Sequence, residues 1–117
     1  CFAGNSPVSF KNIKHLGCLK SSELASELKE SDCFITASKN DPCSNSLLEA
    51  VACGLKILAL NSGGHPEILK NEACLFDSKE TLLKKIISPD SLTKPSNIVS
   101  MKEVSEKYIK FFESILE

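Results

Sequence analysis

The fold is decided by the stretch CFITASKNDPCSNSLLEAVACGLKILAL, residues 33–60, in which two apolar runs flank a helical segment. Its first five and last five residues are continuous apolar runs, of the kind that is buried on both faces of a parallel sheet. Between them, a polar loop leads to a helix that begins at Ser44 or Ser46 and ends near Cys53, where Gly54 can adopt the left-handed terminating conformation. The stretch therefore predicts two parallel strands joined by a helix.

The same alternation of elements extends on both sides of this stretch. After an irregular start, the pattern predicts short strands at 13–16 and 73–76, helices at 21–30, 66–69 and 100–116, a helix capped by Ser78, and a surface connection at 88–97. This order predicts an α/β fold, a Rossmann-like parallel sheet with helices on both faces. Four strands are fewer than a complete domain of this type uses, and the chain opens at Cys1 with Met101 as its only methionine. We therefore expect residues 1–117 to be a single partial domain, a fragment that lacks the first strands of its sheet.

The composition fits an ordinary domain and disfavours several classes of partner. Of the 117 residues, 42% are hydrophobic and 25% are charged, and the formal net charge of -1 gives no summed field that would recruit nucleic acid or an anionic membrane. Every basic residue is lysine, so a bound phosphate would be held by ammonium groups or backbone N–H donors. The six cysteines include no C-x-x-C pair, which argues against zinc or redox chemistry and favours reduced, mostly structural thiols in the cytoplasm.

The loop at 38–46 is the strongest candidate for a ligand site. Ligands of parallel α/β folds bind outside the carboxyl ends of the strands, and this loop ends at a helix N-terminus, whose unpaired N–H groups attract phosphate. Asp41 lies in the loop, and Glu49 follows eight residues later on the helix. Two acids that flank a phosphate site can accept hydrogen bonds from the hydroxyl groups of a nucleotide-sugar. The alternative for Glu49 is structural, because Ser46 and Glu49 have the spacing of a capping box.

Residues 41–69, DPCSNSLLEAVACGLKILALNSGGHPEIL, carry a family resemblance. They resemble the nucleotide-sugar-binding C-terminal domain of GT-B glycosyltransferases, particularly the retaining family 4 enzymes (glycosyl transferases group 1). The shared features are two acids separated by seven residues, a helix of small residues, Gly, a strand, and a Gly-Gly loop before Pro-Glu-Ile. The segments HLGCL at 15–19, SELASELKESDCFI at 22–35 and YIKFFESIL at 108–116 also fit, so the resemblance runs from about residue 13 to the end.

This resemblance implies roles for particular residues. Asp41 and Glu49 would be the catalytic residues, with Glu49 holding the ribose hydroxyls and Asp41 contacting the donor sugar. Backbone N–H groups after Asp41 would cradle the sugar and the distal phosphate, and backbone groups after the first strand would hold the base. The donor-binding residues so implied are Cys43, Ser44, Asn45, Cys18, Leu19, Gly63 and Gly64. Two departures from the family pattern are Asp41, where Glu is usual, and the run 43–45, where Phe-Gly-Leu is common.

A reaction and its partners are also implied by the resemblance. The intact enzyme would pass a sugar from a nucleoside diphosphate to an acceptor hydroxyl with retention at the anomeric carbon, in polysaccharide or glycolipid biosynthesis, without a metal or other cofactor. Its partners would be the nucleotide-sugar donor and an N-terminal domain of the same chain, and any peripheral membrane association would involve only parts outside residues 1–117. These residues alone are expected to be inactive, because the acceptor-side groups and the basic residues for the pyrophosphate would lie upstream.

Two alternative functions stay open at this point. One is a nucleotide-sugar epimerase of the same fold, whose distinguishing acids would lie elsewhere in the protein. The other is a non-catalytic interaction domain that kept the fold and lost the site, which the substitution at Asp41 permits. His65 is interpreted as a polar loop residue rather than as an acid or base, because no catalytic partner lies at motif spacing. The apolar side of the last helix is interpreted as core or interdomain packing.

Overall fold

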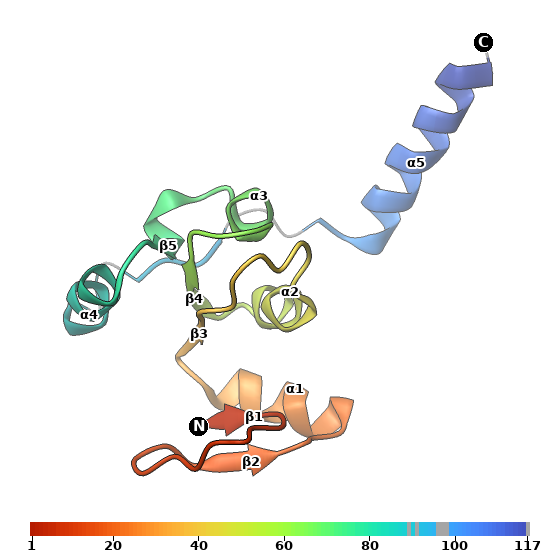
Figure 1. Ribbon diagram of the computed structural model, residues 1–117. Helices are drawn as coiled ribbons and strands as arrows, with labels where there is room; N and C mark the ends of the chain where they lie inside the picture. Colours follow the sequence, from red (N-terminus) through yellow and green to blue (C-terminus); the bar gives the residue numbers. More distant parts are fainter. Residues whose placement is uncertain (89, 91, 96–98, 117) are drawn as a thin grey trace.

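A computed structural model describes residues 1–88, 90, 92–95 and 99–116, and strands alternate with helices along most of it (Figure 1). The elements are β1 (Phe2–Ala3), β2 (His15–Gly17), α1 (Ser21–Glu30), β3 (Cys33–Thr36), α2 (Asn45–Ala52), β4 (Lys56–Leu60), α3 (His65–Leu69), the 3-10 turn η1 (Glu72–Cys74), β5 (Leu75–Phe76), α4 (Lys79–Ile87) and α5 (Met101–Leu116). All paired strands are parallel. The predicted Rossmann-like α/β class is therefore confirmed.

β3, β4 and β5 form a three-stranded parallel sheet with β4 in the middle. Thr36 at the end of β3 pairs with Ala59 of β4. Helix α2 contacts β3 and β4, α4 contacts β5, and the two helices lie on opposite sides of the sheet in Figure 1. Ile57, Leu58 and Ala59 are fully buried. The central strand is thus covered on both faces, as its continuous apolar run predicts.

The single sheet expected from the sequence is divided into two in the structure. β2 pairs with β1, a strand that the sequence pattern does not predict, and it does not pair with β3. The ring of Phe2 packs against the rings of Phe10 and His15, with centroid distances of 4.9 and 5.5 Å, and the Phe2 amide donates to the Lys14 carbonyl at 2.8 Å. These contacts hold the first residues against β2. A strand of two residues is too short to produce a periodic pattern in the sequence.

Serine caps begin three of the helices, as predicted. The Oγ of Ser44 accepts a hydrogen bond from the Leu47 amide at 3.4 Å, so α2 is capped by Ser44 and the alternative start at Ser46 is wrong. Ser78 caps α4, and Ser100 caps α5 by accepting from the amide three residues later. Each cap satisfies one amide that the first helical turn leaves unpaired.

Several other element ends differ from the sequence-based expectation. The strand predicted at 13–16 is observed as β2 at His15–Gly17. Lys20, not Ser21 or Ser22, is the N-cap of α1, because Glu23 Oε2 accepts a hydrogen bond from the Lys20 amide at 2.8 Å. The strand predicted at 73–76 is reduced to the two residues of β5. The turn η1 replaces the first part of this strand. The Asn71 side chain accepts a hydrogen bond from the Ala73 amide at 3.0 Å, and this bond turns the chain.

The hydrophobic core lies between α2 and the three-stranded sheet. Its buried members are Leu28, Leu47, Ala50, Val51, Leu55, Ile57, Ala59, Leu69 and Cys74. All six cysteines are free, as predicted. Thr93 lies beside this core, because its carbonyl accepts a hydrogen bond from the Ile57 amide at 3.2 Å, and Pro95 is buried. The predicted surface connection is therefore wrong for these residues, and its positions 89, 91 and 96–98 lie outside the described residues.

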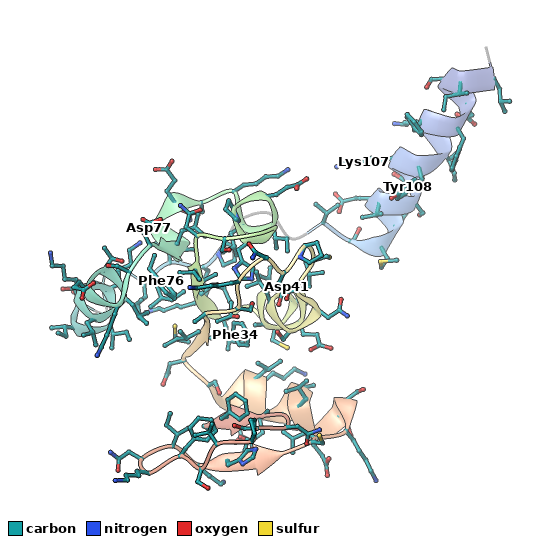
Figure 2. The ribbon with its side chains drawn as sticks, in the orientation of Figure 1. Phe34, Asp41, Phe76, Asp77, Lys107 and Tyr108 are labelled. Atoms are coloured by element: carbon teal, nitrogen blue, oxygen red, sulfur yellow. The ribbon has the colours of Figure 1, made fainter. Side chains whose placement is uncertain are left out.

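Helix α5 projects away from the rest of the chain, as Figure 1 shows and as the labelled Lys107 and Tyr108 show in Figure 2. None of its side chains is buried, and the rings of Phe111 and Phe112 are 58% and 59% exposed. The prediction that this helix packs in the core is therefore wrong. The alternative, that its apolar side packs against another domain, stays a prediction. Among the described residues, no helix combines the length and the apolar character that a membrane span needs.

Candidate functional site

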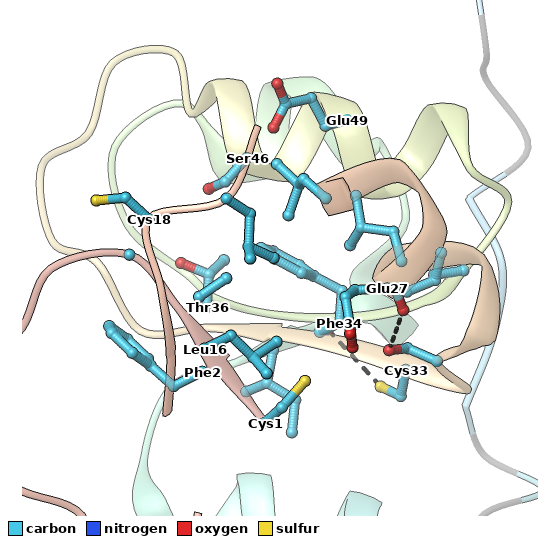
Figure 3. A pocket seen from close by; sticks show the side chains of 18 residues that line it. Cys1, Phe2, Leu16, Cys18, Glu27, Cys33, Phe34, Thr36, Ser46 and Glu49 are labelled. Carbon is cyan, nitrogen blue, oxygen red and sulfur yellow. Dashed lines mark hydrogen bonds between the residues drawn. The ribbon is translucent and has the colours of Figure 1, made fainter. Parts of the chain in front are cut away.

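A cavity of about 620 Å³ lies between the two sheets (Figure 3). One end of its wall is formed where three strands finish, by Gly4 after β1, Cys18 and Leu19 after β2, and Thr36 in β3. Glu49 on α2 completes this end of the wall. The carboxyl ends of strands from both sheets therefore meet at one cavity, and ligands of parallel α/β folds bind at such strand ends. Three of the predicted site residues, Cys18, Leu19 and Glu49, are brought together here.

The other end of the cavity runs along β3 and is mainly apolar. Leu16 and Phe34 face it from the two sheets, and Leu24 faces it from α1. Cys33 also lines this end, and burial raises the pKa of its thiol, an effect that the charge of Lys56 only partly offsets. The thiol is therefore protonated at neutral pH and serves as an apolar wall instead of a nucleophile.

Glu49 lines this cavity from the second turn of α2, and its side chain is exposed. Because Ser44 is the N-cap, the third position of the helix is Leu47, and Glu49 lies two residues beyond it. The capping-box interpretation of Glu49 is therefore wrong. Its carboxylate accepts no hydrogen bond from the residues that the structure describes, so both oxygens are free to accept from a ligand.

The charged side chains of the wall are both acids, Glu27 and Glu49. No lysine belongs to the wall among residues 1–88, 90, 92–95 and 99–116. Within the same residues, no group of three or more His, Cys, Asp and Glu side chains is placed to hold a metal ion. The wall thus offers acceptors to hydroxyl groups and supplies no cation to a phosphate.

Three hydroxyl side chains of the wall, those of Ser31, Thr36 and Ser46, are not among the predicted site residues, and two of them lie at the same end as Glu49. Ser46 lies on the cavity side of α2, three residues before Glu49, and its Oγ is 3.2 Å from Ser44 Oγ. Thr36 lies at the end of β3, and its Oγ1 is 3.2 Å from Ser38 Oγ. The helical spacing of Ser46 and Glu49 places them on one face, and this was the available signal.

Asp41 lies in the loop between β3 and α2 and is not part of the cavity wall. Its Oδ1 accepts a hydrogen bond from the Cys43 amide at 3.1 Å, and its carbonyl accepts one from the Gly64 amide at 2.9 Å. One of the amides assigned to the phosphate is therefore bonded to one of the predicted acids. The predicted site residues that lie outside the cavity wall are Asp41, Cys43, Ser44, Asn45, Gly63 and Gly64.

Gly63 and Gly64 place the loop after β4 directly against the Asp41 loop. A Cβ atom at Gly63 would collide with the backbone of Asp41, and one at Gly64 would collide with the carbonyl oxygen of Pro42. Gly63 also has a φ of +58°, which favours glycine. The Gly-Gly pair thus allows a close approach of two backbone segments.

His65 is fully buried at the start of α3, so its interpretation as a polar loop residue is wrong. Nδ1 lies 2.7 Å from the carbonyl oxygen of Leu60, and Nε2 lies 3.3 Å from Ser38 Oγ. This burial could not be predicted from the sequence, because the two hydrogen-bond partners of the ring belong to other segments of the chain. The two contacts link the segments that follow β3 and β4.

Comparison with known proteins gives one family and a small set of relatives. The family described as "Glycosyl transferases group 1" matches residues 10–97, a range that includes every predicted site residue. Relatives from Saccharomyces cerevisiae strains YJM789, RM11-1a and S288c, each named "Phosphatidylinositol N-acetylglucosaminyltransferase GPI3 subunit", are 27% identical over 92 residues, which is 79% of this chain and 20% of the relative. The chain thus spans about a fifth of the length of these curated relatives. No solved structure matches it.

Proposed function

Because this chain belongs to the glycosyl transferases group 1 family, we propose that it is the nucleotide-sugar donor-binding part of a retaining glycosyltransferase. The intact protein would move a sugar from a nucleoside diphosphate to an acceptor hydroxyl. The observation that carries this proposal is the position of Glu49, whose carboxylate is free and which lines a cavity where β1, β2 and β3 end. Cys18 and Leu19 face the same cavity from the segment after β2.

Glu49 would hold the ribose of the donor. An ionised carboxylate is an acceptor with two oxygens, so it can accept one hydrogen bond from each of two neighbouring hydroxyl groups. Such charge-assisted bonds are stronger than bonds between neutral groups. Backbone groups of Cys18 and Leu19 would contact the base on the opposite side of the same cavity end.

The phosphates would lie toward the N-terminus of α2, where Asp41 precedes the helix. The reaction requires stabilisation of the negative charge that develops on the departing diphosphate, and the positive end of the α2 dipole contributes to this. The described cavity wall holds no lysine, so the cations that complete the stabilisation would come from the N-terminal domain or from residues upstream. To bind a phosphate, the Cys43 amide would give up its hydrogen bond to Asp41 Oδ1 and donate to a phosphate oxygen instead.

The names of the relatives suggest a first choice of substrates. They describe a subunit that transfers N-acetylglucosamine to phosphatidylinositol, and we propose a donor that carries N-acetylglucosamine and a phosphatidylinositol acceptor for this protein as well. Because the relative is named as a subunit, we also propose that the intact protein works with other subunits. The six free thiols are consistent with a donor site on the cytoplasmic side.

The decisive experiment incubates the full-length protein with a panel of nucleoside diphosphate sugars, N-acetylglucosamine included, with and without phosphatidylinositol. The release of the nucleoside diphosphate and the anomeric configuration of the sugar product are followed by NMR. We expect release that requires the acceptor and a product with the anomeric configuration of the donor. Interconversion of the sugar without an acceptor would indicate an epimerase instead, and neither release nor interconversion with any donor would indicate an interaction domain.

A further inference from the structure

His65 joins the ends of β3 and β4 from a position with no exposed surface. Nδ1 lies 2.7 Å from the carbonyl oxygen of Leu60, the last residue of β4, and Nε2 lies 3.3 Å from Ser38 Oγ. Ser38 Oγ in turn lies 3.2 Å from Oγ1 of Thr36, the last residue of β3. A continuous series of side-chain hydrogen bonds therefore crosses from one strand end to the next.

The partners of His65 fix the position of its proton. A carbonyl oxygen only accepts hydrogen bonds, so Nδ1 carries the proton of the neutral ring and donates it to Leu60. Nε2 is then an acceptor, and the hydroxyl group of Ser38 is the donor that fits it. An apolar side chain would fill the same space without either bond. The two bonds offset the cost of burying a polar ring in the core.

The loop that carries Asp41 is tied to the segment after β4 by two backbone amides. The Asn40 amide donates to Ser62 Oγ at 3.1 Å, and the Gly64 amide donates to the Asp41 carbonyl at 2.9 Å. Ser62 and Gly64 are half-buried, so neither tie is made by a side chain in the core. A tie through a fully buried side chain would fix the loop relative to the sheet more firmly.

The contact between Ser38 and His65 supplies that tie, because His65 is buried and bonded to β4. At the far end of the loop, Ser44 is 4% exposed and caps α2. We propose that His65 is a positioning residue that, through Ser38, sets where the Asp41 loop lies for donor binding. The use of the loop for a donor rests on the proposed function, whereas the placement of the loop by His65 does not.

The test compares Ser38→Ala and His65→Asn with the control Ser26→Ala in the full-length protein without donor. Ser38 and Ser26 are both exposed, and the Ser26 side chain makes no hydrogen bond with the described residues. The shorter side chain of His65→Asn can still donate to the Leu60 carbonyl but does not reach Ser38. Long-range ¹H–¹⁵N spectra report the tautomer of the ring, and amide hydrogen exchange reports the opening of the loop.

In the unaltered protein we expect a protonated Nδ1 and an unprotonated Nε2 on His65, with the Nε2 resonance shifted in Ser38→Ala. The Asn40, Cys43 and Gly64 amides should exchange about three- to tenfold faster in both variants, as expected for the loss of one hydrogen bond, while the amides of β4 stay unchanged. A protonated Nε2, or loop exchange equal to that of Ser26→Ala, overturns the proposal. If His65→Asn does not fold, Ser38→Ala decides alone, because Ser38 is exposed.

Failure of the proposed function is distinguishable from failure of this inference. Diphosphate release from a nucleoside diphosphate sugar is measured on the same proteins. Faster amide exchange in the loop of Ser38→Ala, together with a lower kcat than that of Ser26→Ala, supports both the placement role of His65 and the proposed function. Faster loop exchange in a protein that releases no diphosphate from any donor supports the placement role of His65 and contradicts the proposed function.

Discussion

The Cys43 amide donates a hydrogen bond to Oδ1 of Asp41 at 3.1 Å. A bond from an aspartate side chain to the backbone two residues later is an Asx turn, which orders a loop much as a backbone turn does. Aspartate suits this turn because its carboxylate reaches the amide directly, whereas glutamate carries an additional methylene. Asp41 therefore has a structural role beside its proposed contact with the donor sugar.

Substitution of Asp41 separates these two roles. The amide oxygen of Asp41→Asn still accepts from Cys43, but the negative charge is lost, whereas Asp41→Ala loses both. We expect the Cys43 amide to exchange at an unchanged rate in Asp41→Asn and faster in Asp41→Ala, with donor turnover reduced in both. Hydrogen exchange and diphosphate release measure the two effects. Full turnover in Asp41→Asn would show that the sugar contact does not use the charge.

Glu49→Gln tests the ribose contact in the intact protein. The fold should be unaffected, because Glu49 caps nothing and its side chain is exposed. Loss of a charge-assisted hydrogen bond typically costs about 1.5 to 3 kcal/mol, so donor affinity should fall by roughly ten- to a hundredfold. Calorimetric titration with a nucleoside diphosphate sugar measures this change. Glu106→Gln on α5 is the control, and equal affinities in the two variants would remove Glu49 from the site.

Gly64→Ala tests the contact between the two loops. The φ of Gly64 is -84°, which any residue adopts, so the collision of a new Cβ with Pro42 is the source of its cost. Overpacking of this kind costs about 1 to 3 kcal/mol. Gly54→Ala is the matched control, because Gly54 has open space around it and a φ of +76°. Urea unfolding should show a loss of stability in both, whereas faster exchange of the Asn40 amide should occur only in Gly64→Ala. Unchanged Asn40 exchange there would contradict the loop contact.

Glu103 makes the start of α5 sensitive to acid. The amide and the hydroxyl group of Ser100 donate to its carboxylate and hold the pKa of Glu103 below its ordinary value. A carboxyl group with a lowered pKa stabilises the folded state above the unfolded pKa, and this contribution is lost as the pH falls through the lowered value. We expect the first turn of α5 to fray in that range, and less so in Glu103→Gln. An NMR titration of the Glu103 carboxyl with a midpoint at or above the ordinary value would contradict this.

The parts of the fold that were predictable from sequence are those with local signals. The strand Lys56–Leu60 was predicted at its observed bounds because its run of apolar residues is buried on both faces. Ser44 and Ser78 have the short polar side chains that cap helices, and both caps are present. By contrast, β1 depends on the packing of the Phe2 ring against Phe10 and His15, a contact that no short sequence pattern reveals.

A smaller part of the candidate site could be predicted. Cys18 and Leu19 line the cavity because they follow a strand, a position that can be recognised in a sequence, and Glu49 joins them from α2, whereas the other predicted site residues lie outside the wall. The burial of His65 was not predictable, because it depends on the Leu60 carbonyl and on Ser38, which only the three-dimensional arrangement brings to the ring. The Asx turn at Asp41 was likewise not predicted, because the sequence reasoning interpreted Asp41 only as a contact for the donor.

The separation of β1 and β2 from the larger sheet has a consequence for cooperativity. Segments that share few backbone hydrogen bonds with the rest of a protein open at a lower free energy than its core, and these strands share no sheet with β3. A donor held between Leu19 and Glu49 would contact both segments at once. A ligand that binds only when both segments are folded stabilises that state by RT ln(1 + L/Kd), where L is the concentration of free ligand. Donor binding would therefore make the opening of the β1–β2 segment and the opening of the larger sheet more cooperative.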